Sequence, residues 1–219
     1  MSHPYHHAAS SARQFGGVPA DYMPAHHWFD ATKIAIADQR HRAFRHHVEA
    51  IQELENALRA TEIVNQDGAK VSVRSIGLQH LAEDFGGYLP ERREWVEQVT
   101  ERPWMKLAGN QGLAAVDACT RRYGGTANDY AQLVEWFYEG TSGDPRSFYH
   151  RGHAMACFWA EEMFGVTFPL STGKALPTRL AAELIVSSMF ESRIIPAPQD
   201  WVRAIIRPTW QGKPQLLAA

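Results

Sequence analysis

The chain has 219 residues, of which 45% are hydrophobic and 11% aromatic, a composition typical of a packed globular protein and not of a disordered one. The formal net charge of −2 provides no net basicity that would favour non-specific binding to nucleic acid or membranes. Two widely separated cysteines form no CxxC motif, the first residues contain no apolar signal segment, and no run approaches the roughly 18 apolar residues of a membrane span. We therefore expect a cytoplasmic protein.

The apolar pattern predicts two helices at the start of the chain. The first is expected from about Pro24 to Ile36, and the second begins at the N-cap Asp38 and reaches Arg59. The later segment GDPR supports this cap, because Asp144 there precedes Pro145, and proline is favoured at the first helical position.

A hairpin and two more helices follow in the predicted order. Residues 61–74, TEIVNQDGAKVSVR, indicate a β-hairpin because Asp-Gly favours a tight turn with positive φ. The third helix spans about Gly77 to Asp84, and the fourth carries Trp95 and Val99. Because the later part of the chain shows the same plan, the fold class is mainly α with a small β-hairpin in each half.

The second half of the chain repeats the first. ARQFGGVPADYMPAHHWFD from Ala12 aligns with TRRYGGTANDYAQLVEWFY from Thr120, and ADQRHRAFRHHVEA aligns with GDPRSFYHRGHAMA further on. We interpret this as a tandem duplication of a helical module of about 105 residues, with copies at 1–108 and 109–219. Each copy can bury an apolar face on the other, which favours a pseudo-two-fold arrangement.

The segment ADQRHRAFRHHVEA contains three histidines and three arginines in 14 residues. On a helical wheel drawn from Asp38, His47 lies within the apolar stripe, and the more polar residues lie on or near the opposite face. His47 and Glu55 recur as His153 and Glu161. We interpret His47 as a core histidine with a hydrogen-bond partner, and a ligand role is the alternative.

Imidazole and carboxylate side chains also recur at spacings that place them on one helix face. His26 and Asp30 are four residues apart, and His80 precedes a Glu-Asp pair by three and four residues, so that these groups can converge on one ion. The metal ligands that we predict are His26, Asp30, His41 and His46. The predicted catalytic residues are His80, Glu83 and Asp84. The guanidinium groups predicted to bind phosphate or carboxylate oxygens are Arg42, Arg45 and Arg74.

The second copy has lost most of these polar residues. At the equivalent positions stand Val134, Tyr138, Ser147, Phe148, Gly152, Ile185, Ser188 and Met189. In one explanation the first copy holds a polar site and the second is a degenerate partner. In the other, the duplicated surface became the contact between the copies. The N-terminal histidines His3, His6 and His7 add ligands if that segment folds over the site, and a mobile tail is the alternative.

The first copy resembles a family of short uncharacterised phage and bacterial proteins, the DUF6915 type. The resemblance rests on SHPYHHAASSARQFGG, DYMPAHHWFD, ADQRHRAFRHH, NQDGAKVSVR and GLQHLAEDFGGYLP, and covers about residues 1–105. It implies a phage or bacterial context and supplies no activity. The second copy departs from this pattern, so no site residue is transferred to it.

Two functions fit these observations. Histidine with Asp and Glu, without cysteine, favours Zn²⁺, Mn²⁺ or Fe²⁺, and neighbouring arginines favour a metal-dependent hydrolase acting on a phosphorylated or nucleotide-like small molecule. The alternative is a non-catalytic phage or bacterial binding protein that sequesters an anionic ligand or inhibits a host protein. That alternative rests on the duplicated small module, the absence of a hydrolase signature and the aromatic residues of EWFYEG, which we expect to be exposed.

The expected partners follow from the same hypotheses. They are a small anionic molecule or a host protein, with no membrane and with a homo-oligomer left open. Nucleic acid is disfavoured by the balanced charge, although the arginines between Arg40 and Arg45 could contact phosphates.

Overall fold

The structure is a computed structural model that describes residues 3–109 and 111–206. It divides into two compact units, unit 1 up to Gln98 and unit 2 from Val99 to Ile206. Unit 2 thus begins before residue 109, where the sequence places the second copy. The reason is local pairing: Val99 forms a β-bridge with Ile205, and Leu107 forms one with Phe190, so residues 99–108 belong to unit 2.

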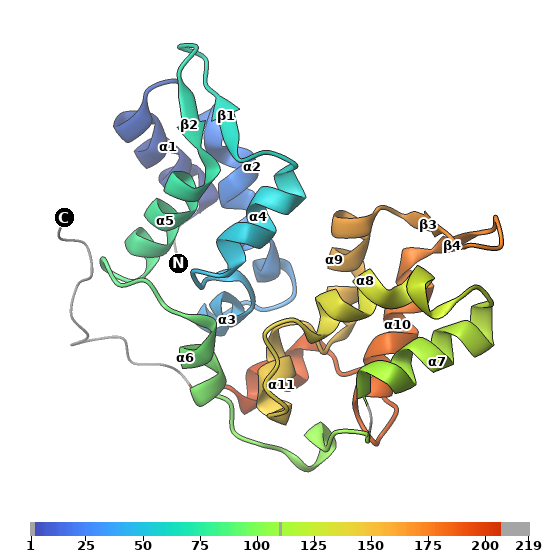
Figure 1. The fold of residues 1–219 in the computed structure, drawn as a ribbon. Coiled ribbons are helices and arrows are strands. Elements are labelled where there is room, and N and C mark those ends of the chain that lie inside the picture. The colour runs from blue at the N-terminus through green and yellow to red at the C-terminus, as the bar shows by residue number, and fades with distance from the viewer. Residues whose placement is uncertain (1–2, 110, 207–219) are drawn as a thin grey trace. The chain divides into compact units, whose positions relative to one another are not determined.

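Unit 1 is a set of helices with one hairpin (Figure 1). Helix α5 packs against α1, α2 and α4. The elements are α1 (Pro4–Phe15), α2 (Pro19–Asp30), η1 (Ala31–Ile34), η2 (Gln39–His41), α3 (Arg42–Arg45), α4 (Ala50–Leu58), β1 (Glu62–Val64), β2 (Lys70–Ser72), α5 (Val73–Asp84) and α6 (Arg92–Glu97).

Unit 2 repeats the order of the main helices and the hairpin. Helix α10 packs against α7, α8 and α9. The elements are η3 (Pro103–Met105), α7 (Gln111–Tyr123), α8 (Ala127–Tyr138), η4 (Pro145–His150), α9 (Ala154–Phe164), β3 (Thr167–Pro169), β4 (Ala175–Pro177), α10 (Thr178–Met189) and α11 (Pro198–Ala204). The predicted fold class, mainly α with one small hairpin in each half, is confirmed.

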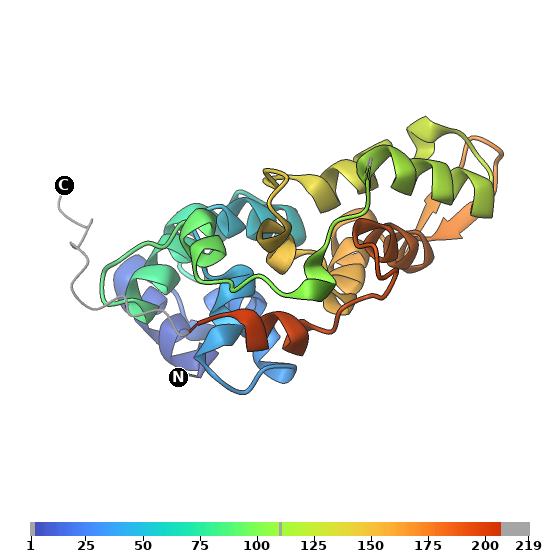
Figure 2. The ribbon, with the colours of Figure 1, turned by 90° about the horizontal axis from the view of Figure 1, so that it is seen from below.

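The hairpins have the predicted position and turn. β1 pairs antiparallel with β2 in the register Ile63↔Val71, and β3 pairs with β4 in the register Phe168↔Leu176. Gly68 has a φ of +79°, the positive value expected of Asp-Gly turns. Each hairpin projects from its own unit (Figure 1), and the β3–β4 hairpin is also seen in the view of Figure 2.

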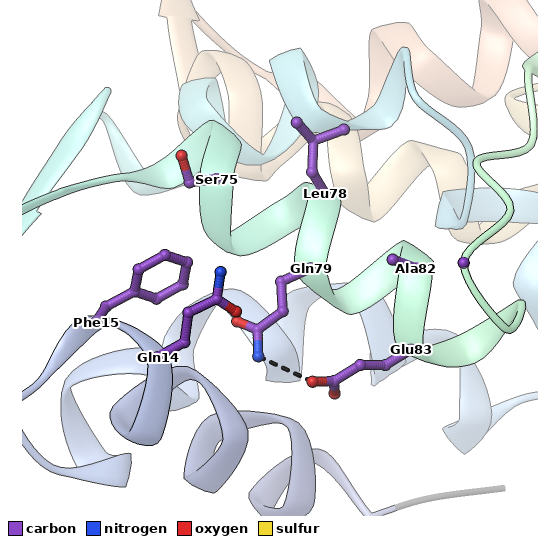
Figure 3. Close-up of a pocket in the computed structure, with 8 residues that line it drawn as sticks. Gln14, Phe15, Ser75, Leu78, Gln79, Ala82 and Glu83 are labelled. Carbon is purple, nitrogen blue, oxygen red and sulfur yellow. Dashed lines mark hydrogen bonds between the residues drawn. The ribbon is translucent and has the colours of Figure 1, made fainter. Parts of the chain in front are cut away.

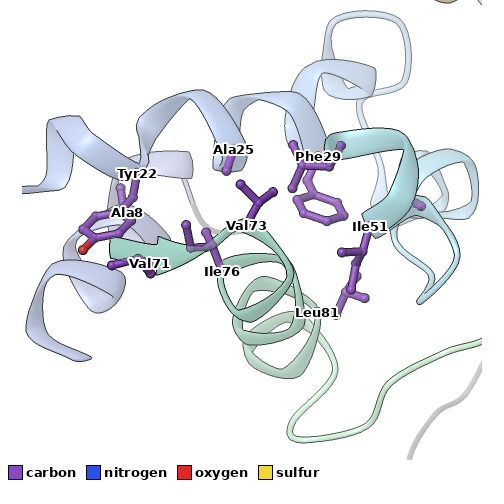
Figure 4. Close-up of a cluster of buried hydrophobic side chains, with 11 residues drawn as sticks. Ala8, Tyr22, Ala25, Phe29, Ile51, Val71, Val73, Ile76 and Leu81 are labelled. Carbon is purple, nitrogen blue, oxygen red and sulfur yellow. The ribbon is translucent and has the colours of Figure 1, made fainter. Parts of the chain in front are cut away.

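The apolar core of unit 1 lies where α1, α2, α4 and α5 meet (Figure 4). Tyr22 and Phe29 of α2, Ile51 of α4 and Ile76 and Leu81 of α5 are all fully buried. Each fully buried apolar side chain of this size contributes on the order of 1.5–3 kcal/mol. This core holds α2 and α5 side by side, which matters for the site because both helices supply polar side chains to it.

The predicted helix from Asp38 to Arg59 is wrong, because the chain leaves helical geometry at His46, with φ −100° and ψ 67°. A new helix, α4, starts at Ala50, and the Nδ1 atom of His47 accepts a hydrogen bond from the Ala50 N–H at 3.1 Å. In unit 2, His153 accepts in the same way from Ala156. The recurrence of this histidine therefore reflects a capping role, and the helical wheel drawn through the segment does not apply.

Other boundaries shift for similar local reasons. Helix α2 begins at Pro19, before the predicted Pro24, because Asp21 accepts a hydrogen bond from the Val18 N–H and stabilises the first turn. Asp38 accepts from the Arg40 N–H, as Asp144 does from Arg146, so the predicted cap is confirmed, although it caps a short 3₁₀ turn. Among the described residues, no helix combines the length and apolar character needed to span a bilayer.

Candidate metal centre

Four polar side chains of unit 1 meet at one buried point. Asp30 is the last residue of α2, His46 follows α3, and His80 and Asp84 lie one turn apart on α5. Each residue offers one donor atom, and these four atoms lie within 4.8 Å of one another. Among the described residues, no other set of three or more such side chains is as close together.

The spacing of the donor atoms matches the size of a divalent ion. Nε2 of His46 lies 3.1 Å from Nε2 of His80, 3.1 Å from Oδ2 of Asp84 and 3.6 Å from Oδ1 of Asp30. Nε2 of His80 lies 3.6 Å from Oδ2 of Asp84. Ligands about 2.0–2.1 Å from a tetrahedral ion are separated by about 3.3 Å, and cis ligands of an octahedral ion by about 3.0 Å. These four separations span those values, and all four atoms lie within 4.8 Å of one another, so they are close enough together to hold one small divalent ion.

The centre is shielded from solvent. His46 and His80 are fully buried, and the carboxylates of Asp30 and Asp84 are 2% and 4% exposed. Within the part of the chain that the structure describes, Oδ2 of Asp30, Nδ1 of His46 and Nε2 of His41 have no hydrogen-bond partner. Each such buried polar atom costs about 1–3 kcal/mol. Of the three atoms only the Asp30 oxygen belongs to a donor group at the centre, because His46 faces the other donors through Nε2 and His41 is outside the set of four, so a cation there would offset the cost at Asp30.

Burial lowers the pKa of three imidazoles in and around the centre. It lowers the pKa of His26 to about 4 and that of His41 to about 3, and it lowers the pKa of His80 well below the ordinary value. Burial by itself raises the pKa of Asp84, but the hydrogen bond from His46 and the positive charge of Arg42 outweigh it and lower that pKa to about 2. At neutral pH His80 is therefore a neutral imidazole and Asp84 an ionised carboxylate, the forms that bind metal.

Cationic and aromatic neighbours hold the four side chains in place. Lys33 Nζ lies 2.7 Å from Oδ1 of Asp30, and Arg42 donates to Oδ1 of Asp84 at 2.6 Å. The ring of His80 stacks on Phe29 with centroids 4.6 Å apart and an interplanar angle of 11°. These contacts restrict the rotamers of the donors, as expected of groups that surround a metal site.

The predicted site residues form an inner group of four donors and an outer layer of residues around it. Asp30 and His46, predicted as ligands, lie at the centre, and they are joined by His80 and Asp84, which were predicted as catalytic. His26 lies one step further out, with its Nδ1 2.9 Å from Nδ1 of His80. The remaining two are also outside the set of four: His41 contacts the Thr32 hydroxyl at 3.0 Å, and Glu83 contacts His7 at 2.6 Å.

The three predicted anion-binding arginines have different environments. Arg42 lies beside the centre and pairs with Asp84. Arg45 is 2% exposed, donates to the carbonyl of Trp28 and lies over its ring at 4.2 Å, so it packs within unit 1 and is not on the polar helix face that the helical wheel places opposite His47. Arg74 is exposed on the first turn of α5, whereas the centre is buried. Only Arg42 is therefore placed to act with the four donors.

The N-terminal histidines were expected to be ligands or part of a mobile tail, and the structure separates them. Residues 4–15 form α1, with Pro4 at its first position, and this helix places His7 against Glu83 and 3.6 Å from Oδ1 of Asp84. His3 and His6 are exposed. Sequence reasoning missed Ser11, Thr32 and Gln79, since a hydroxyl or amide has no metal-ligand pattern of its own.

A cavity of about 540 Å³ lies between α1 and α5 (Figure 3). Its lining residues are Gln14, Phe15, Ser75, Leu78, Gln79, Ala82, Glu83 and Gly87. Gln79 and Glu83 form part of the wall and are joined by a 2.8 Å hydrogen bond. Because Glu83 also contacts His7 and Gln79 contacts Ser11, this wall reaches the outer layer of the centre.

The comparison with known proteins gives a family and no activity. A model of the family described as a domain of unknown function (DUF6915) matches residues 2–105 and again residues 113–211. The two matches confirm both the resemblance and the tandem duplication. No curated protein and no solved structure matches the chain.

Proposed function

Because the chain belongs to the DUF6915 family, whose description names no activity, we propose a function from the geometry of the centre itself. Unit 1 binds one divalent metal ion through Asp30, His46, His80 and Asp84, and the chain is a metal-dependent hydrolase. The observation that carries this proposal is the spacing of the four donor atoms, 3.1–3.6 Å along the four separations given above, inside a buried site.

The donor set favours Zn²⁺, Mn²⁺ or Fe²⁺. Two imidazoles and two carboxylates without a thiolate are borderline ligands that suit these ions. An ion held by these four residues would supply a Lewis acid and would lower the pKa of a bound water so that hydroxide forms near neutral pH. This is the chemistry that hydrolysis requires.

The proposed substrate is a small phosphorylated or nucleotide-like molecule. Arg42 supports this, because its guanidinium lies at the edge of the centre and can stabilise negative charge that develops there. The cavity between α1 and α5 has the volume of a small-ligand site, about 540 Å³; none of the four donors lines it, but Glu83 in its wall directly precedes Asp84 on α5. The proposed setting is a reducing cytoplasm, in keeping with the free Cys119 and Cys157.

A second candidate is a non-catalytic binding module whose metal only stabilises the fold. The burial of all four donors favours it, because structural sites are closed by four protein ligands and catalytic ones keep an open position. The aromatics of EWFYEG give it no support, since Trp136 is 8% exposed and Phe137 is fully buried.

One experiment separates these candidates. Protein purified without an affinity tag is analysed for bound metals, and then assayed with Mn²⁺, Fe²⁺ or Zn²⁺ on a phosphomonoester and a phosphodiester of p-nitrophenol. We expect about one ion per chain and metal-dependent turnover that is lost in Asp84→Asn. Metal binding without turnover on these probes, together with a closed four-ligand coordination shell, supports the non-catalytic module. If none of the three ions binds, both candidate functions are overturned.

A further inference from the structure

A continuous run of hydrogen bonds leads from Glu83 at the cavity wall to His80 at the centre. Gln79 Nε2 lies 2.8 Å from Glu83 Oε1, and Gln79 Oε1 lies 2.6 Å from Ser11 Oγ. Ser11 Oγ lies 2.9 Å from His26 Nε2, and His26 Nδ1 lies 2.9 Å from His80 Nδ1. Every link is within normal hydrogen-bond distance, and only the first touches the cavity.

The first links have one possible direction. A carboxylate only accepts, so the amide N–H₂ of Gln79 must face Glu83 and its carbonyl oxygen must face Ser11. That carbonyl oxygen also only accepts, so the Ser11 hydroxyl donates its single proton to it. Ser11 Oγ then has no proton left for His26 and must accept from it.

The positions of the protons on the two histidines follow in the same way. His26 donates from Nε2 to Ser11, and because a neutral imidazole carries one N–H, its Nδ1 is an acceptor. His80 must then donate from its own Nδ1, which leaves its Nε2 without a proton. That Nε2 is the atom that faces His46 and Asp84.

We propose that Ser11, Gln79 and His26 are positioning residues that select the tautomer of His80, with Glu83 as the fixed end of the chain. They hold His80 with its proton on Nδ1, so that the lone pair of Nε2 points into the centre as a ready ligand. A partner on the outer nitrogen of a metal-binding histidine is a general means of fixing its tautomer and ring orientation.

The burial of these residues lets the run of hydrogen bonds control the tautomer of His80. Ser11, His26 and His80 are fully buried, so water has little access to replace a missing partner. A second proton on His26 would place a charged imidazole in this fully buried position, which is costly, so that ring carries one proton. Loss of Ser11 would let His26 carry its proton on Nδ1, and His80 would then shift its proton to Nε2, where it blocks the ligand atom.

The tautomer can be measured without any metal. Two-bond ¹H–¹⁵N correlation spectra of the imidazoles identify which nitrogen of His80 is protonated in the metal-free full-length protein. We compare the wild type with Ser11→Ala and Gln79→Leu, with Ser11→Thr as the variant that keeps a hydroxyl. Gln14→Leu is the matched control, because Gln14 lines the same cavity but is not part of the run of hydrogen bonds from Glu83 to His80.

The wild type, Ser11→Thr and Gln14→Leu should show His80 protonated at Nδ1, and Ser11→Ala and Gln79→Leu should show a population protonated at Nε2. The affinity for Zn²⁺ or Co²⁺ should fall 10–100-fold in Ser11→Ala and Gln79→Leu alone. This second readout rests on the proposed function, and the first does not. A wild-type His80 protonated at Nε2, or an unchanged tautomer in folded Ser11→Ala and Gln79→Leu, overturns the inference even if metal binds. If the tautomers behave as expected but no metal binds, the proposed function fails and the positioning chain stands.

Discussion

Trp95 in unit 1 and Trp201 in unit 2 occupy equivalent positions, and each donates its indole N–H to a backbone carbonyl, that of His46 and that of Gly152. Arg45 and Arg151 likewise each lie 4.2 Å over a tryptophan ring of their own unit. Tyr22 and Tyr130 each donate to the carbonyl of a glycine six residues earlier. The contacts that hold the helical frame together are therefore the same in both units.

The units differ in what fills this frame. Where unit 1 has His26, His80 and Asp84, unit 2 has Val134, Ile185 and Met189, all buried. His46 corresponds to Gly152, and a Cβ atom at Gly152 would lie 2.8 Å from the carbonyl oxygen of Phe148 and 3.2 Å from the ring of Phe190. Unit 2 has thus closed the space that a histidine side chain would need.

This difference bears on the two explanations of the duplicated sequence. Ile185 and Met189 lie on α10, which packs against α7, α8 and α9 of its own unit, so the lost polar residues were replaced by core residues of unit 2. The fold accepts an apolar core at this place. Unit 1 instead buries imidazoles and carboxylates, which is costly without a ligand and therefore favours a functional centre there.

The largest difference between the units is expected when a ligand is removed from unit 1 and, separately, its counterpart is removed from unit 2. His80→Ala should weaken metal binding more than about 100-fold, since loss of a ligand exceeds the effect of an outer contact. Ile185→Ala should cost about 2–5 kcal/mol of stability through the cavity it leaves, with unchanged metal affinity. Isothermal titration with Zn²⁺ and chemical denaturation measure the two effects. Equal metal affinity in wild type and His80→Ala contradicts the assignment.

Metal removal should separate the units by stability. An ion present at about 100 times its Kd stabilises the folded form by about 2.7 kcal/mol, which corresponds to on the order of 10 °C in the Tm of a domain this size. When a chelator removes the ion, amide hydrogen exchange should therefore become faster in α2 and α5 and change little in α7 and α10. A uniform change in both units, or none, would show that no ion is held specifically by unit 1.

The arginines test which polar contacts belong to the frame and which to the centre. Arg45→Ala and Arg151→Ala should each destabilise by about 1–3 kcal/mol, because each removes a stacked guanidinium and leaves a backbone carbonyl without its donor. Neither should change metal affinity.

Arg42→Ala should instead lower metal affinity about 10-fold with a smaller loss of stability, since the Asp84 carboxylate loses the 2.6 Å contact that fixes its orientation. Urea denaturation and metal titration of the three variants supply the comparison. A loss of metal affinity in Arg45→Ala equal to that in Arg42→Ala would remove the distinction.

The smallest effect concerns the thiols of unit 2. Burial raises the pKa of Cys119 and Cys157 to about 12, from an ordinary value near 9. The folded protein holds these protons more tightly than the unfolded chain, so the stabilising contribution is complete below about pH 9 and is lost as the pH rises towards 12. At pH 8 a disulfide reagent should react with neither thiol until the protein is unfolded, and rapid reaction of the native protein would show that unit 2 is not closed as described.

Much of the fold followed from the sequence because the chain contains its own comparison. The repeated Asp38 and Asp144 identified a cap, and the Asp-Gly turn identified a hairpin, since both depend on local backbone chemistry. The break at His46 was missed because a helical wheel assumes continuity, and the signal that could have shown it was the recurrence of His47 as His153, a cap of a new helix.

The residue types of the candidate site were predicted from the sequence, but which residues form its inner group and which surround them was not. Asp30, His46, His80 and Asp84 were all singled out, since imidazole and carboxylate are ligand types that divalent ions prefer and the second copy lacks them. Which of them meet, and that Arg45 belongs to the frame, depends on contacts between helices that no local pattern encodes. The recurrence of Arg45 as Arg151 in the unit without the polar residues did carry that information.

The most direct test of the central claim is X-ray absorption spectroscopy of the full-length protein loaded with one equivalent of Zn²⁺ or Mn²⁺. The account predicts a first shell of nitrogen and oxygen ligands at about 2.0–2.2 Å, with the multiple scattering of two imidazoles and no sulfur. It also predicts that the imidazole signal falls in His46→Ala. A spectrum of a fully hydrated ion, or one unchanged in that variant, would contradict it.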